Sequence, residues 1–256
     1  MAIVKYMPVC RHNDDILILL RRRPADCAAQ IRVGSQAIRV LMIDQLRADV
    51  PHEEFDYLAL MTGLRGYARP RDRVTTLLRH QAIIRVKKGL YVFGPTYRRA
   101  PYSREVLANL MYGPSCISLE YALSYYGLIP ERVETVPSAT TGKSRAFDSP
   151  VGRFTYWPVP ERVFPIGIDR IETGDGRAFL MARRERALCD VLIQRRGLKI
   201  RTLGQLGTWL ADDLRYDTDE LASLDATLVS GIARTWGSAR LRLLAQLLQN
   251  RKASDE

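Results

Sequence analysis

Basic side chains gather in one stretch of this chain, and their types suit contact with a polyanion. Between Arg65 and Arg104 the only acidic residue is Asp72, whereas the two signs of charge intermix after residue 210. Arginine can bond bidentately to guanine, and lysine can contact phosphate as a point charge. We therefore predict double-stranded DNA as the partner. The residues expected to contact it are Arg69, Arg71, Arg73, Thr75, Thr76, Arg79, His80, Arg85, Lys87 and Lys88.

A second stretch, Gly142-Lys143-Ser144, resembles the end of a phosphate-binding loop. Such a loop needs a glycine five residues earlier, where backbone N–H groups wrap the phosphates. That position is Pro137, which has no N–H, and the residues from Arg145 onward look extended rather than helical. The pattern favours a basic β-turn.

Carboxylates and histidines offer little catalytic chemistry. Glu185 and Asp190 could be imagined as a metal-binding nuclease pair, but residues five apart lie well apart around a helix and arginines surround them. We interpret them as a surface carboxylate and an ion-pair partner. His12, His52 and His80 have no Cys, Asp or Glu at metal-ligand spacing. We expect no metal, no cofactor and no catalytic residue.

The basic residues would be positioned by a helix and a hairpin. Pro70 suits the first helical turn, and an apolar stripe at helical spacing follows it. Residues 83–86 and 90–93 read as two strands joined by a turn in which Gly89 supplies a positive φ. The stripe consists of Val74, Leu77, Leu78 and Gln81.

Two more helices are expected before this one. The first begins at a Ser35 cap and runs to Pro51, and the second spans 53–61. Their predicted inward residues are Ile38, Leu41, Met42 and Leu46 in the first, and Phe55, Leu58 and Ala59 in the second. Three helices followed by a basic hairpin predict a winged helix-turn-helix over 35–95, whose last helix enters the major groove. Residues 1–34 remain an unassigned N-terminal extension.

A mixed α+β domain with a helical C-terminal tail is expected over 100–256, after a connector at 95–101. Strands are predicted at 133–136, 145–147, 153–157, 166–171 and 178–181. Helices are predicted from Ser103, from Ser118 to Gly127, over 185–195, and three times in the tail, around 206–210, 221–232 and 239–248. The whole chain is thus α/β in the broad sense (α+β), and we expect residues 100–256 to fold without the first domain.

Composition sets the outer limits. The 256 residues carry 39 Lys+Arg against 28 Asp+Glu, a net charge of +11, and 46% hydrophobic residues provide for a core in each domain. The four cysteines form no CxxC pair, and Cys116 and Cys189 fit as small core residues of helices. The apolar run 16–20 is too short to span a bilayer, and its flanking charges are the reverse of a signal peptide. We expect a cytoplasmic protein that meets no membrane.

Three motifs in order give the chain a family resemblance. Residues 79–92 look like a helix end followed by an r-G-l-Y-v wing, and 118–129 like an S-x-x-x-A-L-x-x-x-G-L-I helix. Residues 182–190 look like an A-x-x-E-K-A-L-x-D helix, with Arg186 in place of Lys. With these motifs the chain resembles, over about residues 35–195, the AbiEi-type antitoxins of type IV toxin–antitoxin operons, which act in phage abortive infection.

The resemblance implies a transcriptional regulator whose winged helix represses its own operon. It also implies that the second domain counteracts a nucleotidyltransferase-like toxin, directly or indirectly. One alternative is a nucleic-acid enzyme, such as a nuclease, that a winged helix targets to its substrate. Another is a transcription factor unrelated to any toxin.

Overall fold

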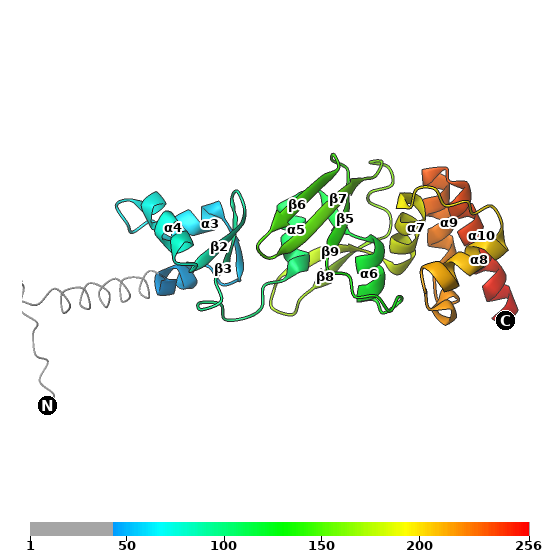
Figure 1. The fold of residues 1–256 in the computed structure, drawn as a ribbon, viewed down its shortest axis with the longest axis horizontal. Coiled ribbons are helices and arrows are strands. Elements are labelled where there is room, and N and C mark those ends of the chain that lie inside the picture. Colours follow the sequence, from blue (N-terminus) through cyan, green and yellow to red (C-terminus); the bar gives the residue numbers. More distant parts are fainter. Residues whose placement is uncertain (1–42, 256) are drawn as a thin grey trace, which may run out of the picture. The chain divides into compact units, whose positions relative to one another are not determined.

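The computed structural model of this chain describes residues 43–255 (Figure 1). They divide into two units, which we describe separately. The first comprises the segment up to Pro51 together with residues 58–82, and the second comprises His52–Tyr57 and everything from Ile83 onward. The extension 1–34 and the start of the helix predicted from Ser35 lie outside the described residues.

The first unit is a small cluster of helices. Residues 43–49 are helical, followed by α3 (Tyr57–Gly63) and α4 (Pro70–Arg79). A Cβ on Gly63 would lie 2.6 Å from Leu46 Cδ1, so the absence of a side chain lets these two segments approach closely. The core of this unit is formed by Ile43, Leu46, Leu60, Leu64 and Leu77.

The expectation for α4 is confirmed. Pro70 occupies the start of the helix, and Val74 and Leu77 are buried on its inner face. Gln81 lies beyond the helix end with φ 53°, so it does not continue the buried stripe.

The second predicted helix was wrong in its first half. Residues Glu54–Asp56 form strand β1, and the helix begins only at Tyr57. The later start changes which residues face inward: Leu58, expected in the core, is 73% exposed, and Leu60 is buried instead. Phe55 is buried as expected, but through β-pairing, with its ring centroid 4.7 Å from that of Phe93.

A three-stranded antiparallel sheet of order β1-β3-β2 opens the second unit. Strands β2 (Ile83–Lys87) and β3 (Leu90–Phe93) confirm the predicted hairpin, with Gly89 at φ 87° in its turn. β1 pairs with the far side of β3, Glu54 opposite Val92. Local propensity in the sequence favoured helix here, and pairing with a distant strand overrode it.

A mixed six-stranded sheet is the centre of the second unit, in the order β6-β7-β5-β4-β9-β8. β5 pairs in parallel with β7, and β4 in parallel with β9, whereas the remaining neighbours are antiparallel. Strand β4 and most of β5 were not anticipated from the sequence. The strands are β4 (Ser115–Ile117), β5 (Val136–Thr140), β6 (Arg145–Ser149), β7 (Gly152–Pro158), β8 (Ile168–Glu172) and β9 (Ala178–Ala182).

Helices α5 (Arg104–Met111), α6 (Leu119–Tyr125) and α7 (Arg184–Gln194) accompany this sheet and match the predicted positions. The Ser103 hydroxyl caps α5 by accepting a hydrogen bond from Val106 N, and Gly127 ends α6 with φ 73°. Figure 1 shows α7 next to the tail helices, where it packs against α9 and α10.

The tail is helical, as predicted. It contains α8 (Leu203–Thr208), a π-helical turn (Trp209–Asp213), a 3₁₀ turn (Thr218–Leu221), α9 (Ala226–Trp236) and α10 (Ala239–Asp255). The described chain is therefore a mixed α and β structure. Among residues 43–255, none of the helices combines the length and apolar character that a bilayer crossing requires.

Candidate nucleic-acid interface

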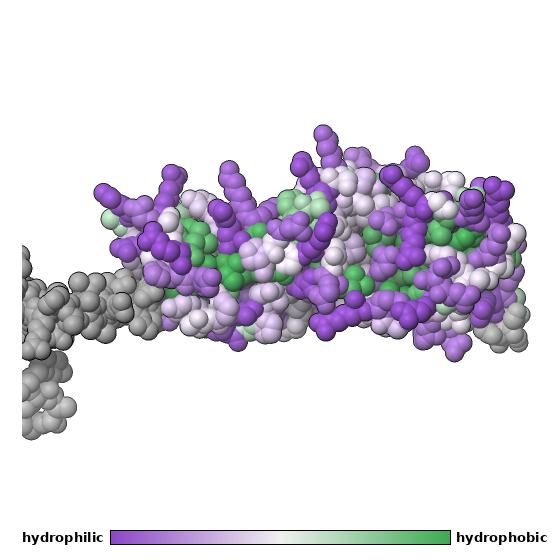
Figure 2. Space-filling model, in the orientation of Figure 1, coloured by the Kyte–Doolittle hydropathy of each residue, from purple (hydrophilic) through white to green (hydrophobic). Residues whose placement is uncertain are grey.

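Three arginines on or beside α4 stand free on its exposed side. Arg69, Arg71 and Arg79 are exposed, and within residues 43–255 none of their guanidinium groups has an ion-pair partner. Figure 2 shows hydrophilic side chains projecting from the surface around α4. Because an exposed arginine without an acidic partner breaks no ion pair when it binds an anion, these three are available for phosphates or base edges.

Arg73 is held differently from its neighbours. It is half-buried, and its guanidinium carbon lies 5.3 Å from the centroid of the Tyr67 ring. A cation over an aromatic ring is attracted by the ring's negative face. Contact with DNA would therefore require Arg73 to leave or share this position, which the exposed arginines need not do.

The two threonines and the histidine complete the predicted set on this helix. Thr75 is exposed and Thr76 half-buried, and each hydroxyl donates to a carbonyl one turn earlier, Thr75 to Arg71 O at 3.3 Å and Thr76 to Asp72 O at 3.0 Å. His80 is exposed and follows the last residue of α4. α4 thus carries seven of the ten predicted residues on or beside one short helix, as its spacing required.

The hairpin divides its three basic residues. Arg85 and Lys88 are exposed, whereas Lys87 is half-buried and its Nζ donates a hydrogen bond to the Met111 carbonyl oxygen. Burial lowers the pKa of the Lys87 ammonium below its ordinary value. The expectation that Lys87 contacts phosphate therefore meets a competing partner inside the second unit, and only Arg85 and Lys88 are left free on this hairpin.

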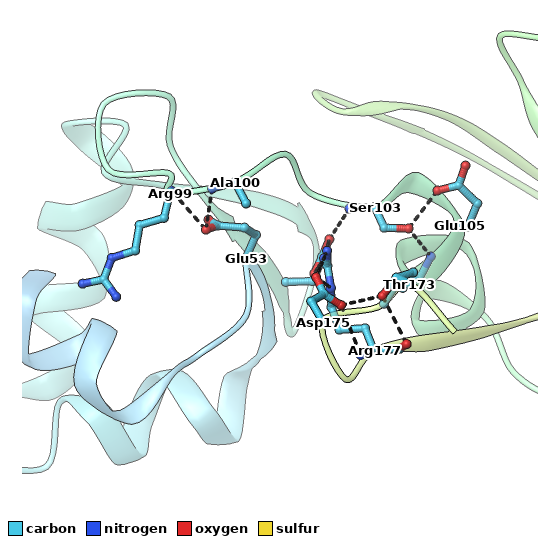
Figure 3. A network of polar contacts seen from close by, with 10 residues as sticks. Glu53, Arg99, Ala100, Ser103, Glu105, Thr173, Asp175 and Arg177 are labelled. Atoms are coloured by element: carbon cyan, nitrogen blue, oxygen red, sulfur yellow. Dashed lines mark hydrogen bonds and ion pairs between the residues drawn. The ribbon is translucent and has the colours of Figure 1, made fainter. Parts of the chain in front are cut away.

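A polar network next to the hairpin sheet was not foreseen (Figure 3). Glu53 accepts hydrogen bonds from the backbone N–H groups of Arg99 and Ala100, at 3.0 and 3.2 Å. Glu54 pairs with Arg177 in the turn between β8 and β9, and it also accepts from Ser103 N. These carboxylates tie β1 to the connector and to the larger sheet.

The Glu54–Arg177 pair is largely shielded from water. The two side chains are 1% and 11% exposed, and one Arg177 nitrogen lies 2.5 Å from Glu54 Oε2. Asp175 also bonds to Arg177, which holds the pKa of the Asp175 carboxyl well below its ordinary value. A sequence reading could have noticed the Gly174-Asp175-Gly176 turn, but nothing local to it points to Glu54, which is more than a hundred residues away.

The interpretation of the α7 carboxylates as a surface pair was wrong in part. Asp190 is fully buried, with Oδ1 2.8 Å from Arg186 Nε and Oδ2 accepting from the Ser118 hydroxyl at 2.7 Å. Glu185 is 6% exposed and accepts from Asp225 N at 3.0 Å. Asp190 does have its ion-pair partner, but both carboxylates belong to the interior.

Arg186 is the largest fully buried side chain of the described chain. Its Nε pairs with Asp190, and its Nη1 donates to the carbonyl oxygens of Val163 at 2.7 Å and Ile166 at 2.6 Å. Burial raises the pKa of the Asp190 carboxyl, and the Arg186 charge and the Ser118 hydrogen bond oppose that rise. The network joins α6, α7 and the loop before β8, so its chemistry is structural.

The Gly142–Arg145 stretch and the cysteines show no sign of catalytic chemistry in the described residues. Arg145 begins a strand, as expected for a stretch that is not a phosphate loop, and Lys143 N donates to the Tyr112 hydroxyl at 3.1 Å. Cys116 lies on β4 rather than a helix; it and Cys189 are free and buried, and burial raises the pKa of the Cys116 thiol to about 12. Over the described residues, no group of three or more His, Cys, Asp or Glu side chains is placed to share a metal ion.

The chain matches no family model and no curated protein.

Proposed function

We propose that this chain is a cytoplasmic, sequence-specific DNA-binding regulator that represses its own operon and acts as the antitoxin of a type IV abortive-infection system. It would counteract a nucleotidyltransferase-like toxin and would itself catalyse no reaction. The observation that carries the DNA-binding part is the exposed row of unpaired arginines on α4.

The row suits a helix that lies in a major groove. Arg69 and Arg71 flank the helix start, where backbone N–H groups also favour an anion. Arg79 is exposed at the other end of the same helix and can bond bidentately to guanine. The hairpin that follows in the chain supplies Arg85 and Lys88 for phosphates, in the manner of a wing.

The antitoxin part is supported by the family resemblance and by what its motif residues do. Ser118 comes from one motif and Asp190 from another; with Arg186, which stands where that motif has Lys, they form the buried network that joins α6 to α7. Residues with this role specify a fold rather than a reaction. The match of Ser118 and Asp190 to the family's motifs therefore favours a shared fold, and the family's function is the proposal that goes with it.

The experiment measures binding of the full chain to the DNA upstream of its own gene by fluorescence anisotropy. Arg79→Ala should weaken binding to that DNA by about 1–3 kcal/mol and binding to random duplex by much less. Arg242→Ala is the matched control, since Arg242 is an exposed arginine on α10 outside the predicted set. Equal losses for the two variants, or no preference for the upstream DNA, would contradict the DNA-binding proposal.

A second assay separates the antitoxin part. The neighbouring toxin gene is expressed with wild type or with Arg79→Ala, and growth is scored. Protection that persists in the variant supports an effector role for residues 100–256 that does not run through DNA binding. Loss of protection in step with loss of repression would show that the antitoxin activity is only transcriptional.

A further inference from the structure

A cavity of about 450 Å³ opens on the second unit beside the sheet formed by β5, β6 and β7. Thr155 and Trp157 of β7 form part of its wall, and the end of α7 contributes Gln194. Its size lies within the range of small-molecule sites in proteins, about 300–1,000 Å³. Neither the proposed DNA contacts nor the buried Arg186 network uses this cavity.

The basic turn that resembles a phosphate loop borders the same cavity. Ser144 and Arg145, at the end of that turn, are exposed lining residues. Over the residues that the structure describes, the Arg145 guanidinium has no hydrogen bond or ion pair. The turn lacks the backbone of a Walker A loop, but it still places the Arg145 guanidinium and the Ser144 hydroxyl beside the cavity.

Several polar groups around this cavity can donate hydrogen bonds. Thr135 and Thr155 add hydroxyls, and Gln194 adds an amide. The carboxylate that lines the cavity, Glu120, is partly neutralised because Arg195 lies 3.3 Å from it. The free guanidinium is donor-only, and together with hydroxyls that can turn to donate it suits an anion rich in acceptor oxygens.

We infer that this cavity binds a nucleoside phosphate, with the phosphate at Arg145 and Ser144 and the nucleoside against Trp157 and Gln194. A mononucleotide fits the volume, it presents the acceptor atoms that the donors need, and its planar base can pack beside the Trp157 indole. The Trp157 ring already stacks on Trp236, with centroids 6.3 Å apart and planes 1° from parallel, so the indole is fixed in place. A fixed aromatic wall lowers the entropic cost of binding.

The test uses the full chain and isothermal titration calorimetry with ATP, GTP, CTP and UTP in turn. At least one should bind saturably, and Arg145→Ala should weaken that binding roughly 10- to 100-fold, as loss of a charge-assisted hydrogen bond does. Arg153→Ala is the matched control: it lies on β7 and is exposed, but it pairs with Asp148 at 3.6 Å and does not line the cavity. Its affinity should equal that of the wild type.

Two further arms identify the ligand class. Inorganic phosphate and the free nucleoside should each bind at least 10-fold more weakly than the nucleotide if both halves of the cavity take part. Phosphate binding as tightly as the nucleotide would overturn the assignment of the nucleoside half. Absence of binding by all four nucleotides, or equal affinity of Arg145→Ala and wild type, would overturn the site itself, because both variants are surface changes whose folding circular dichroism can verify.

Discussion

Replacing Arg186 by methionine should remove much of the stability of the second unit. Both Arg186 and Asp190 are 0% exposed, and their atoms Nε and Oδ1 are 2.8 Å apart. The variant keeps similar volume but leaves the Asp190 carboxylate in the interior with Ser118 as its remaining partner. Breaking a buried pair in this way costs about 3–5 kcal/mol, because one charge is left uncompensated.

The loss should depend on pH in a defined direction. Burial already raises the pKa of Asp190, and the Arg186 charge opposes that rise, so the pKa in the variant is higher still. A carboxyl whose pKa is higher in the folded than in the unfolded state favours folding at low pH and loses this contribution as pH rises through the folded value. The gap between wild type and Arg186→Met should therefore widen as pH rises above the ordinary range of a carboxyl pKa.

Urea denaturation followed by tryptophan fluorescence measures this gap in the relevant unit, since all 3 tryptophans lie after residue 150. Arg184→Met is the matched control: it is on the same helix, but its pair with Glu220 is 36% and 46% exposed, so it should cost less than about 1 kcal/mol. The double variant Arg186→Met with Asp190→Asn should recover part of the loss. A loss below about 1 kcal/mol for Arg186→Met, or a gap that does not change with pH, would refute the reasoning.

Three more outcomes are expected. Lys88→Ala should reduce the slope of log K for DNA binding against log salt concentration by about 0.9. Lys87→Ala should leave this slope unchanged, because Lys87 Nζ bonds to the Met111 carbonyl oxygen. Equal slopes for the two variants in a salt titration would contradict the assignment of the phosphate contact to Lys88 alone. Arg177→Met should destabilise the second unit by about 3 kcal/mol in urea, because the Glu54 carboxylate at 1% exposure loses its cation and keeps only the Ser103 N–H; the surface variant Arg170→Met should not. A fragment of residues 100–256 should melt at a lower temperature than a fragment of residues 52–256, because the strand residues 86, 90 and 92 belong to the same apolar cluster as 106 and 107. Equal melting temperatures would instead support a domain boundary at the predicted connector, residues 95–101.

The sequence by itself determined the elements whose signals are local. The start of α4 followed from Pro70, the hairpin from Gly89 and its flanking β-branched residues, and the end of α6 from Gly127. Helix α7 followed from the spacing of Ala187, Leu188, Val191 and Leu192, all of which are buried. Local steric preference and periodicity decide such features, and both can be read within a dozen residues. The basic character of the candidate DNA-binding helix could be predicted for the same reason.

Only the tertiary structure determined the partners and the burial of the polar groups on these elements. Residues Glu54–Asp56 form a strand because β3 pairs with them, and the Lys87 ammonium donates to the Met111 carbonyl oxygen. Asp190 is interior because it pairs there with Arg186 and Ser118. The partners of these residues lie between about 4 and more than 70 positions away, and most are on other elements. A charged side chain shows its type in the sequence, but whether it is free, paired or buried depends on which distant groups the fold brings within hydrogen-bonding distance.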